Sequence, residues 1–217
     1  MNDARAAILN ALRRSLGPSQ PATGAQQTAD REAPRAYVLP AVEGDLVERF
    51  VNRIAATGAS VARVRTATEI PQAVLGFLDA HQLPPALVRS DEPMFVELSW
   101  PVELAVAVRA AADGDRTSLT GVLAAVAETG SLVVASARRS PHTLNFLAEN
   151  HIVVVQVPQV VRHLEDVWLW VRNRPDGMPR ALTFITGPSR TADVEQTIQI
   201  GAHGPRRLHV VLVEEPD

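Results

Sequence analysis

The chain has 217 residues, of which 46% are hydrophobic and 21% are charged, and its formal net charge is −3. This composition supports a sizeable core, and the length suits one α/β domain with appendages. The small negative charge creates no basic field, so we expect no nucleic-acid partner. No apolar run approaches the roughly 18–20 residues that span a bilayer, and we therefore expect a soluble, cytoplasmic protein without a membrane span.

Two residue types are missing from the sequence. There is no cysteine, which excludes disulfides, thiol nucleophiles and Cys-ligated iron–sulfur clusters. All 21 basic residues are arginine, which excludes Schiff-base lysines and a lysine-dependent phosphate loop. We expect this chain itself to carry no cofactor.

The N-terminal part is predicted to be an arm. Residues 1–17 are expected to form an amphipathic helix that ends at Gly17-Pro18. Residues 18–36 are rich in Pro, Gln, Ala and Thr and lack apolar periodicity, which indicates a flexible linker. Residues 37–217 then form the predicted α/β domain.

Helical and strand patterns alternate along this domain. The helices are predicted at 43–57, 68–82, 141–150 and 159–172. The strands are predicted at 59–64, 86–89, 103–108, 151–157, 181–185 and 208–213, with two further apolar pieces in 120–136 joined by Glu128-Thr129-Gly130. Such alternation is typical of a three-layer α/β fold with an open, largely parallel sheet.

Residues 186–205 concentrate polar groups between two apolar runs. We expect a strand to end there and a short helix to begin, at the carboxyl end of the sheet, where ligands usually bind in such folds. Backbone amides and a guanidinium at a helix start would bind an anion. The alternative is a capped helix start in which Arg190 pairs with Asp193. The candidate ligand-binding residues are Gly187, Ser189, Arg190, Thr191, Asp193, Glu195 and Gly204.

Glu128, Thr129 and Gly130 form a second candidate site. A carboxylate at the end of an apolar piece is suited to act as a general base, a nucleophile or the partner of an arginine. The alternative is a plain turn, with Gly130 at positive φ and Thr129 bonding locally.

His203, in Gly-Ala-His-Gly-Pro, is either a pocket base or a residue that bonds its own turn. No pair of histidines has metal-ligand spacing, so no metal site is predicted. Arg138-Arg139 follows a strand, and we interpret this pair as a solvated edge rather than an anion clamp.

Three segments together resemble the LUD domain family, named for lactate utilisation, and within it the short lactate utilisation protein C subunits. They are Ala127-Glu128-Thr129-Gly130-Ser131, Gly187-Pro188-Ser189-Arg190-Thr191-Ala192-Asp193-Val194-Glu195 and Gly201-Ala202-His203-Gly204-Pro205. The resemblance implies a fold similar to the NagB/RpiA/CoA-transferase-like fold. It also implies that two partner subunits carry iron–sulfur clusters and that the complex oxidises L-lactate to pyruvate.

The first functional hypothesis is therefore a cluster-free subunit whose polar pocket holds a small anion such as lactate or pyruvate. In it, Arg190 would bind the carboxylate, while Glu128 and His203 would be the catalytic candidates. Two rivals stay open at this point. One is an independent enzyme that uses Glu128 on a CoA ester, sugar phosphate or folate; the other is a non-catalytic assembly module.

Overall fold

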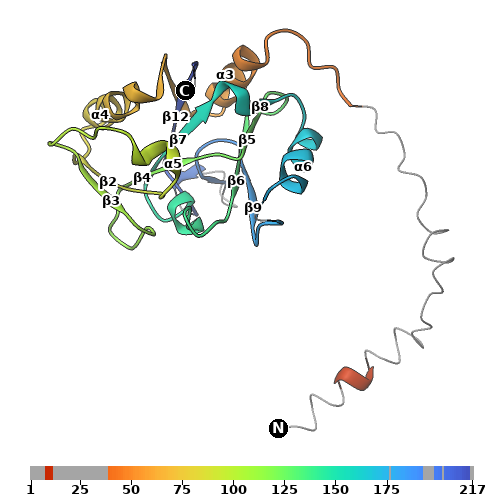
Figure 1. Cartoon of the computed structure of the whole chain (residues 1–217). Coiled ribbons are helices and arrows are strands. Elements are labelled where there is room, and N and C mark those ends of the chain that lie inside the picture. Colours follow the sequence, from red (N-terminus) through yellow and green to blue (C-terminus); the bar gives the residue numbers. More distant parts are fainter. Residues whose placement is uncertain (1–7, 12–38, 176, 193–197, 202, 216–217) are drawn as a thin grey trace. The chain divides into compact units, whose positions relative to one another are not determined.

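The computed structural model describes residues 8–11, 39–175, 177–192, 198–201 and 203–215. The chain divides into two units, residues 1–40 and 41–217. In the first unit residues 8–11 are helical. The rest of the predicted arm and the whole of the predicted linker lie outside the described residues. Figure 1 labels most helices and strands of the second unit.

A six-stranded sheet forms the centre of the second unit. Its strand order is β1-β12-β7-β4-β2-β3, and every neighbouring pair is parallel. This confirms the predicted α/β fold with a largely parallel sheet. The strands are β1 (Ser60–Val64), β2 (Ala86–Arg89), β3 (Ala105–Val108), β4 (Thr117–Gly121), β7 (Asn150–Gln156) and β12 (Arg207–Val213).

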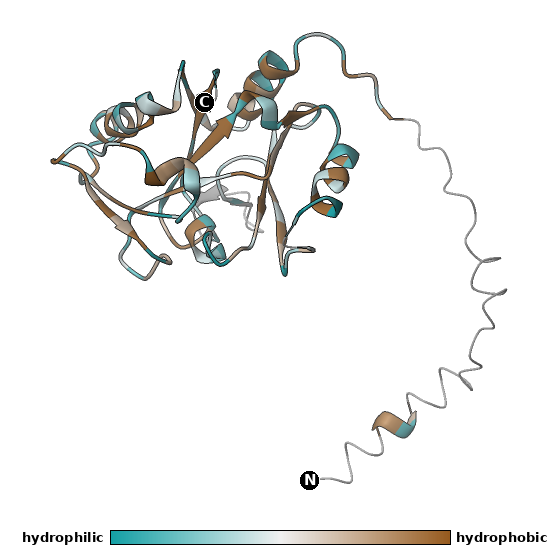
Figure 2. Ribbon diagram, in the orientation of Figure 1, coloured by the Kyte–Doolittle hydropathy of each residue, from teal (hydrophilic) through white to brown (hydrophobic). Residues whose placement is uncertain are grey.

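The central strands are continuous apolar runs because both faces of this sheet are covered. In β7, Ile152 and Val154 pack with α4 (Ile70–Ala80) on one face. Val153 and Val155 pack with α3 (Leu46–Ala56) on the other. Successive side chains of a strand point to opposite faces, so one run of β-branched residues serves both cores. Figure 2 shows these central strands in the hydrophobic colours.

A second, four-stranded sheet lies on the same face as α3, and the sequence did not predict it. Its order is β8-β5-β6-β9, with β5–β6 and β6–β9 antiparallel and β5–β8 parallel. Leu132 packs with Phe50 of α3, and the other face of the sheet packs on Val167 of α6 (Leu164–Arg172). The strands are β5 (Ala124–Val126), β6 (Ser131–Ala135), β8 (Val160–Val161) and β9 (Leu182–Ile185).

Several short elements differ from the prediction. The predicted helix over 141–150 is one 3₁₀ turn, η2 (His142–Asn145). The one predicted over 159–172 starts as η3 (Val157–Gln159) and β8 before α6 begins. A further turn, η1 (Ala67–Glu69), leads into α4, and α5 (Pro93–Val96) lies in a stretch predicted to be irregular. None of the helices among the described residues has the length and apolar character to cross a membrane.

The short helix predicted after Gly187 is wrong. The described residues there form two strands, β10 (Arg190–Ala192) and β11 (Ile198–Ile200), which pair antiparallel. Gly-Pro-Ser followed by acidic residues is typical of a helix start. Here two nearby pieces of the segment instead pair as strands, and β-branched residues such as Thr and Ile favour extended backbone.

Candidate functional site

The Glu128 turn contacts two helices. Glu128 Oε2 lies 3.2 Å from His163 Nδ1, just before α6. Gly130 has φ +72° and lies against α3, where an added Cβ would come within 2.6 Å of the backbone nitrogen of Ile54. The turn therefore requires glycine at this position for both its conformation and its close approach to α3. This matches the turn interpretation of Gly130.

A chain of hydroxyl groups connects the two sequence motifs. Thr129 Oγ1 and Ser131 Oγ are 2.7 Å apart, and Ser131 Oγ lies 2.6 Å from Thr186 Oγ1. The segment that begins at Thr186 is therefore a neighbour of the Glu128 turn.

Gly187 and Arg190 both contact the C-terminal end of α3. Gly187 has φ +112°, and an added Cβ would lie 2.6 Å from Thr57 Oγ1. Arg190 Nη2 donates a hydrogen bond of 2.7 Å to the backbone carbonyl of Thr57, the C-cap of α3. A cation is favourable at a helix C-terminus. Arg190 thus has a structural contact with the C-cap of α3, a partner that the sequence did not suggest.

The Gly187 segment lies at the amino ends of the parallel strands, whereas the sequence predicted that it lies at their carboxyl ends. Ser189 N–H donates to the carbonyl of Pro205, just before β12 starts, and Arg190 reaches Thr57, just before β1 starts. The reason is that β9, which leads into this segment, belongs to the second sheet. Thr191 is described only by its backbone pairing to Gln199, while Asp193 and Glu195 lie outside the described residues.

The two residues predicted to be catalytic, Glu128 and His203, have different neighbours in the described part of the structure. His203 is exposed and, with Gly204 and Arg206, lines a cavity of about 580 Å³. No hydrogen bond or cavity among the described residues joins His203 to Glu128. A pocket that uses both as catalytic groups therefore stays a prediction.

One group of described residues could together hold a metal ion. The ligand atoms of Glu128, His163 and Glu165 lie within 4.8 Å of one another. His163 and Glu128 already contact each other, however, and the positive end of the α6 dipole disfavours a cation there. We infer no metal site from this cluster.

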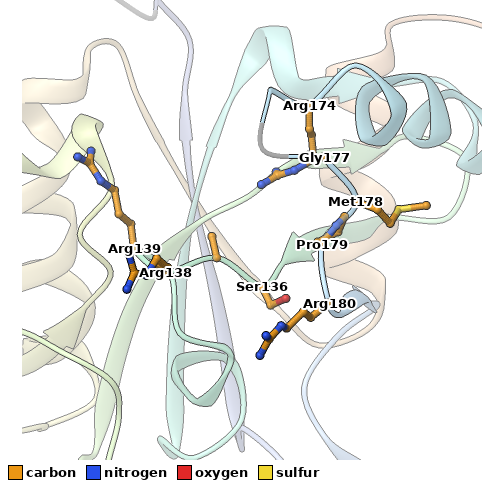
Figure 3. A pocket seen from close by; sticks show the side chains of 9 residues that line it. Ser136, Arg138, Arg139, Arg174, Gly177, Met178, Pro179 and Arg180 are labelled. Carbon is orange, nitrogen blue, oxygen red and sulfur yellow. The ribbon is translucent and has the colours of Figure 1, made fainter.

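Another cavity lies elsewhere in the molecule and is rich in arginine. It has a volume of about 760 Å³ and is hereafter the arginine cleft. Figure 3 shows Arg138 and Arg139 on one wall and Arg174 and Arg180 on the facing wall, with Ser136 between them. The cleft is lined by Ser136, Ala137, Arg138, Arg139, Arg174, Gly177, Met178, Pro179 and Arg180.

A second cavity of about 320 Å³ adjoins the arginine cleft and shares Ala137, Arg139 and Arg174 with it. We call it the Glu92 compartment. Glu92 follows β2, and Gly121 is the last residue of β4. The compartment therefore lies beyond the carboxyl ends of the parallel strands, where open α/β sheets usually bind ligands.

Glu92 is largely removed from water. An added Cβ at Gly121 would overlap Glu92 Oε2, so the carboxyl group lies directly on that backbone. Burial raises the pKa of Glu92, and hydrogen bonding with Ser140 and with the Gly121 amide lowers it in part. A carboxyl group in this environment takes up a proton more readily than an ordinary glutamate and can then donate a hydrogen bond.

The sequence interpretation missed this cleft. It treated Arg138-Arg139 as a solvated edge and did not single out Glu92, Arg174 or Arg180. The available signal was an arginine pair directly after a strand, together with a second arginine-rich stretch between α6 and β9.

A parallel sheet covered by helices and a second sheet defines the chain as an α/β protein. The family is more specific. The model of the LUD domain matches residues 47–213, and the chain belongs to the LUD domain family, as its motifs predicted.

The relatives extend this family relationship. The chain is 29% identical over 222 residues to a protein named lactate utilization protein C from Deinococcus radiodurans. This alignment covers 97% of this chain and 96% of the relative. It is also 29% identical over 93 residues to a protein of the same name from Geobacillus thermodenitrificans. That match spans 42% of this chain and only 39% of the relative.

Two further comparisons concern proteins without a functional name. An uncharacterized protein from Neisseria meningitidis is 33% identical over 98 residues, which span 45% of this chain and 42% of that protein. The crystal structure of a DUF162 family protein from Deinococcus radiodurans has a TM-score of 0.58 and 25% identity, and covers 80% of this chain and 99% of its own. The overall arrangement of elements is therefore shared with an experimentally determined relative.

Proposed function

We propose that this chain is the cluster-free subunit of a system that oxidises L-lactate to pyruvate, and that it holds an anionic ligand in the arginine cleft. The observation that carries the proposal is the alignment to lactate utilization protein C along nearly the whole of both chains. The arginine cleft supports the second part, because guanidinium groups bind carboxylate and phosphate groups with two parallel hydrogen bonds.

The oxidation of lactate releases two electrons and two protons, and this chain has no cysteine with which to hold an iron–sulfur cluster. In the proposal, two partner subunits carry the clusters and take the electrons. This chain contributes ligand binding and assembly. Glu128, beside His163, stays the candidate for a separate catalytic role, as the motif predicted.

The test is reconstitution with the co-purifying partners. We expect the full-length chain to co-purify with iron–sulfur subunits, and lactate-dependent dye reduction to fall at least tenfold when the chain is left out. Adding the purified chain back should restore the rate. Full activity of the partners alone would contradict the proposal, as would an isolated chain that never associates with a cluster-bearing protein.

A further inference from the structure

The arginine cleft carries more positive charge than a small monocarboxylate can neutralise. Four guanidinium groups line it, and no aspartate or glutamate among the described residues does. Arg138, Arg139 and Arg180 take part in no ion pair within the described part of the chain. Arginine remains charged at all ordinary pH values. Among the described residues, Glu92 of the adjoining compartment can offset at most one of these four charges, so a ligand that matches the arginine cleft carries more than one negative charge.

The two walls of the arginine cleft are held together by two hydrogen bonds between Ser136 and Ala181. Ser136 N–H donates to the carbonyl of Ala181, and the amide of Ala181 donates to Ser136 Oγ, both at 2.9 Å. This pairing ties the loop after β6 to the loop before β9, and each loop supplies arginines to the cleft (Figure 3). A ligand with adjacent anionic groups can then bridge two facing guanidinium pairs without reorganising the loops.

The adjoining Glu92 compartment has a different character. Besides Glu92 and Ser140, it is lined by Val122, Leu123 and the half-exposed Trp170. An apolar and aromatic wall beside a few polar groups suits the uncharged body of an organic ligand. The volume of the arginine cleft alone, about 760 Å³, is in the upper part of the range of about 300–1,000 Å³ for ligand sites.

We propose that the arginine cleft binds a nucleotide-sized ligand with two or more adjacent phosphate groups, whose uncharged body occupies the Glu92 compartment. The phosphate groups lie between the arginines of the facing walls. The ring system or other apolar body lies along Trp170, within hydrogen-bonding reach of Glu92. This inference rests on the anion-binding part of the proposed function and is independent of the link to lactate.

The experiment is isothermal titration of the full-length protein with ADP, AMP, adenosine, pyrophosphate and L-lactate at one fixed ionic strength. We expect ADP to bind at least about tenfold more tightly than AMP, and adenosine and lactate to bind far more weakly than either. Pyrophosphate should bind, but less tightly than ADP. Equal affinity for ADP and AMP, or no binding of ADP, overturns the proposal. Pyrophosphate that binds as tightly as ADP overturns the part assigned to the Glu92 compartment.

Matched variants locate the site. Arg138→Gln and Arg180→Gln each remove one guanidinium from opposite walls and should weaken ADP binding at least about tenfold, because each loses charge-assisted hydrogen bonds. Arg65→Gln makes the same charge change at an exposed arginine that lines neither cavity and should alter ADP affinity less than about twofold. Trp170→Ala should weaken ADP binding while leaving pyrophosphate binding unchanged. Equal losses in the Arg65 variant and the cleft variants contradict the assignment.

The two proposals fail separately. If the reconstituted system needs the chain for lactate oxidation but the chain binds no ADP, the ligand inference is wrong and the proposed function stands. If the chain binds ADP through the arginines but lactate oxidation proceeds without the chain, the ligand inference stands and the proposed role in lactate oxidation is wrong. Urea unfolding of each variant confirms that any lost affinity occurs in a folded protein.

Discussion

At the scale of single residues, several motif positions are constrained by the close approach of their backbone to α3. Gly130 and Gly187 have positive φ, and an added Cβ at either would collide with α3 or with its C-cap. Arg190 donates to the same C-cap. These positions combine a rare backbone conformation with tight packing, so substitutions there should cost stability before they affect any chemistry.

Replacing Gly130 with alanine tests this view against Gly44→Ala. Both glycines have positive φ, but an added Cβ at Gly44 would meet no atom within 4 Å. Gly44→Ala should therefore lower the free energy of unfolding by about 1–2 kcal/mol from backbone strain alone. Gly130→Ala should cost about 1–3 kcal/mol more, because α3 must also shift. Urea denaturation measures both, and equal losses would show that packing against α3 contributes nothing.

Local sequence identified the polar motifs but not the arginine cleft. Arg138 and Arg180 are far apart in the chain, and they meet only because β6 and β9 pair antiparallel, with Ala135 opposite Leu182. Nothing in the sequence near either arginine specifies that pairing. A candidate site made within one turn, such as Glu128 to Gly130, is visible to pattern analysis, whereas a site made by non-local strand pairing is not.

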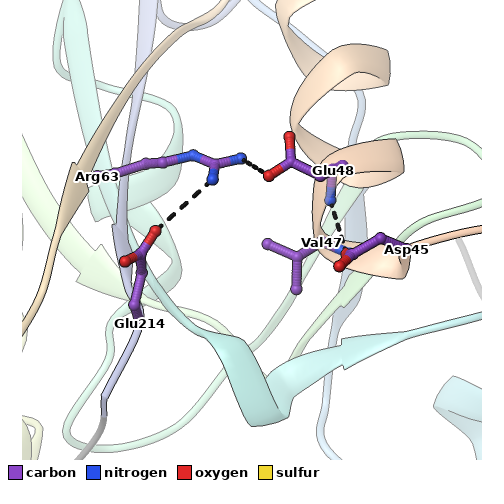
Figure 4. A network of polar contacts seen from close by, with 5 residues as sticks. All are labelled: Asp45, Val47, Glu48, Arg63 and Glu214. Carbon is purple, nitrogen blue, oxygen red and sulfur yellow. Dashed lines mark hydrogen bonds and ion pairs between the residues drawn. The ribbon is translucent and has the colours of Figure 1, made fainter.

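At the scale of elements, α3 is capped at its N-terminal end as well as at Thr57, where Arg190 donates. Asp45 Oδ1 accepts hydrogen bonds from the amides of Val47 and Glu48, at 2.8 and 3.1 Å. Figure 4 shows the adjacent network, in which Arg63 of β1 reaches both Glu48 and Glu214. These exposed ion pairs contribute little, so the cap at Asp45 is the main contribution from polar groups at this end.

The cap predicts a clear difference between two substitutions. Asp45→Ala leaves the Val47 and Glu48 amides without their acceptor and should lower the free energy of unfolding by about 1 kcal/mol. Asp45→Asn keeps an acceptor oxygen and should stay within a few tenths of wild type. Thermal and urea unfolding provide the measurement. A loss in the asparagine variant as large as in the alanine variant would mean that charge, rather than the cap, is responsible.

The element pattern predicted most strands but not their assignment to sheets. A continuous run of β-branched residues indicated a buried strand over residues 151–157, and β7 lies there. The apolar stretch 120–136, by contrast, supplies strands to two different sheets. Hydrophobicity shows that a strand is buried, but the partner strand depends on contacts far away in the chain, and the second sheet was missed for that reason.

At the scale of the whole molecule, two buried histidines make stability depend on pH. Burial lowers the pKa of His151 to about 3, and burial with the nearby His81 lowers the pKa of His209 to about 4. Both are neutral in the folded chain, whereas an unfolded histidine takes up a proton near pH 6.5. Between about pH 6.5 and 4 the unfolded state therefore binds more protons, and stability falls as pH falls.

The free energy of unfolding should drop by up to about 1.4 kcal/mol per pH unit for each histidine in this range. His209→Gln removes one of the two groups, so its pH dependence should be shallower than that of wild type, whatever its stability at neutral pH. Urea unfolding at several pH values between 7.5 and 5 compares the slopes. Parallel curves for the two proteins would contradict a role for His209.

The position of β12 also affects how the protein is made. β12 is the last described strand of the chain, yet it lies between β1 and β7 and is the only strand beside β1 in the six-stranded sheet. A ribosome releases β1 long before β12, so the nascent chain exposes apolar strand edges until β12 has been made. We expect the sheet to close only after translation of β12, which makes the growing chain a natural client for ribosome-associated chaperones.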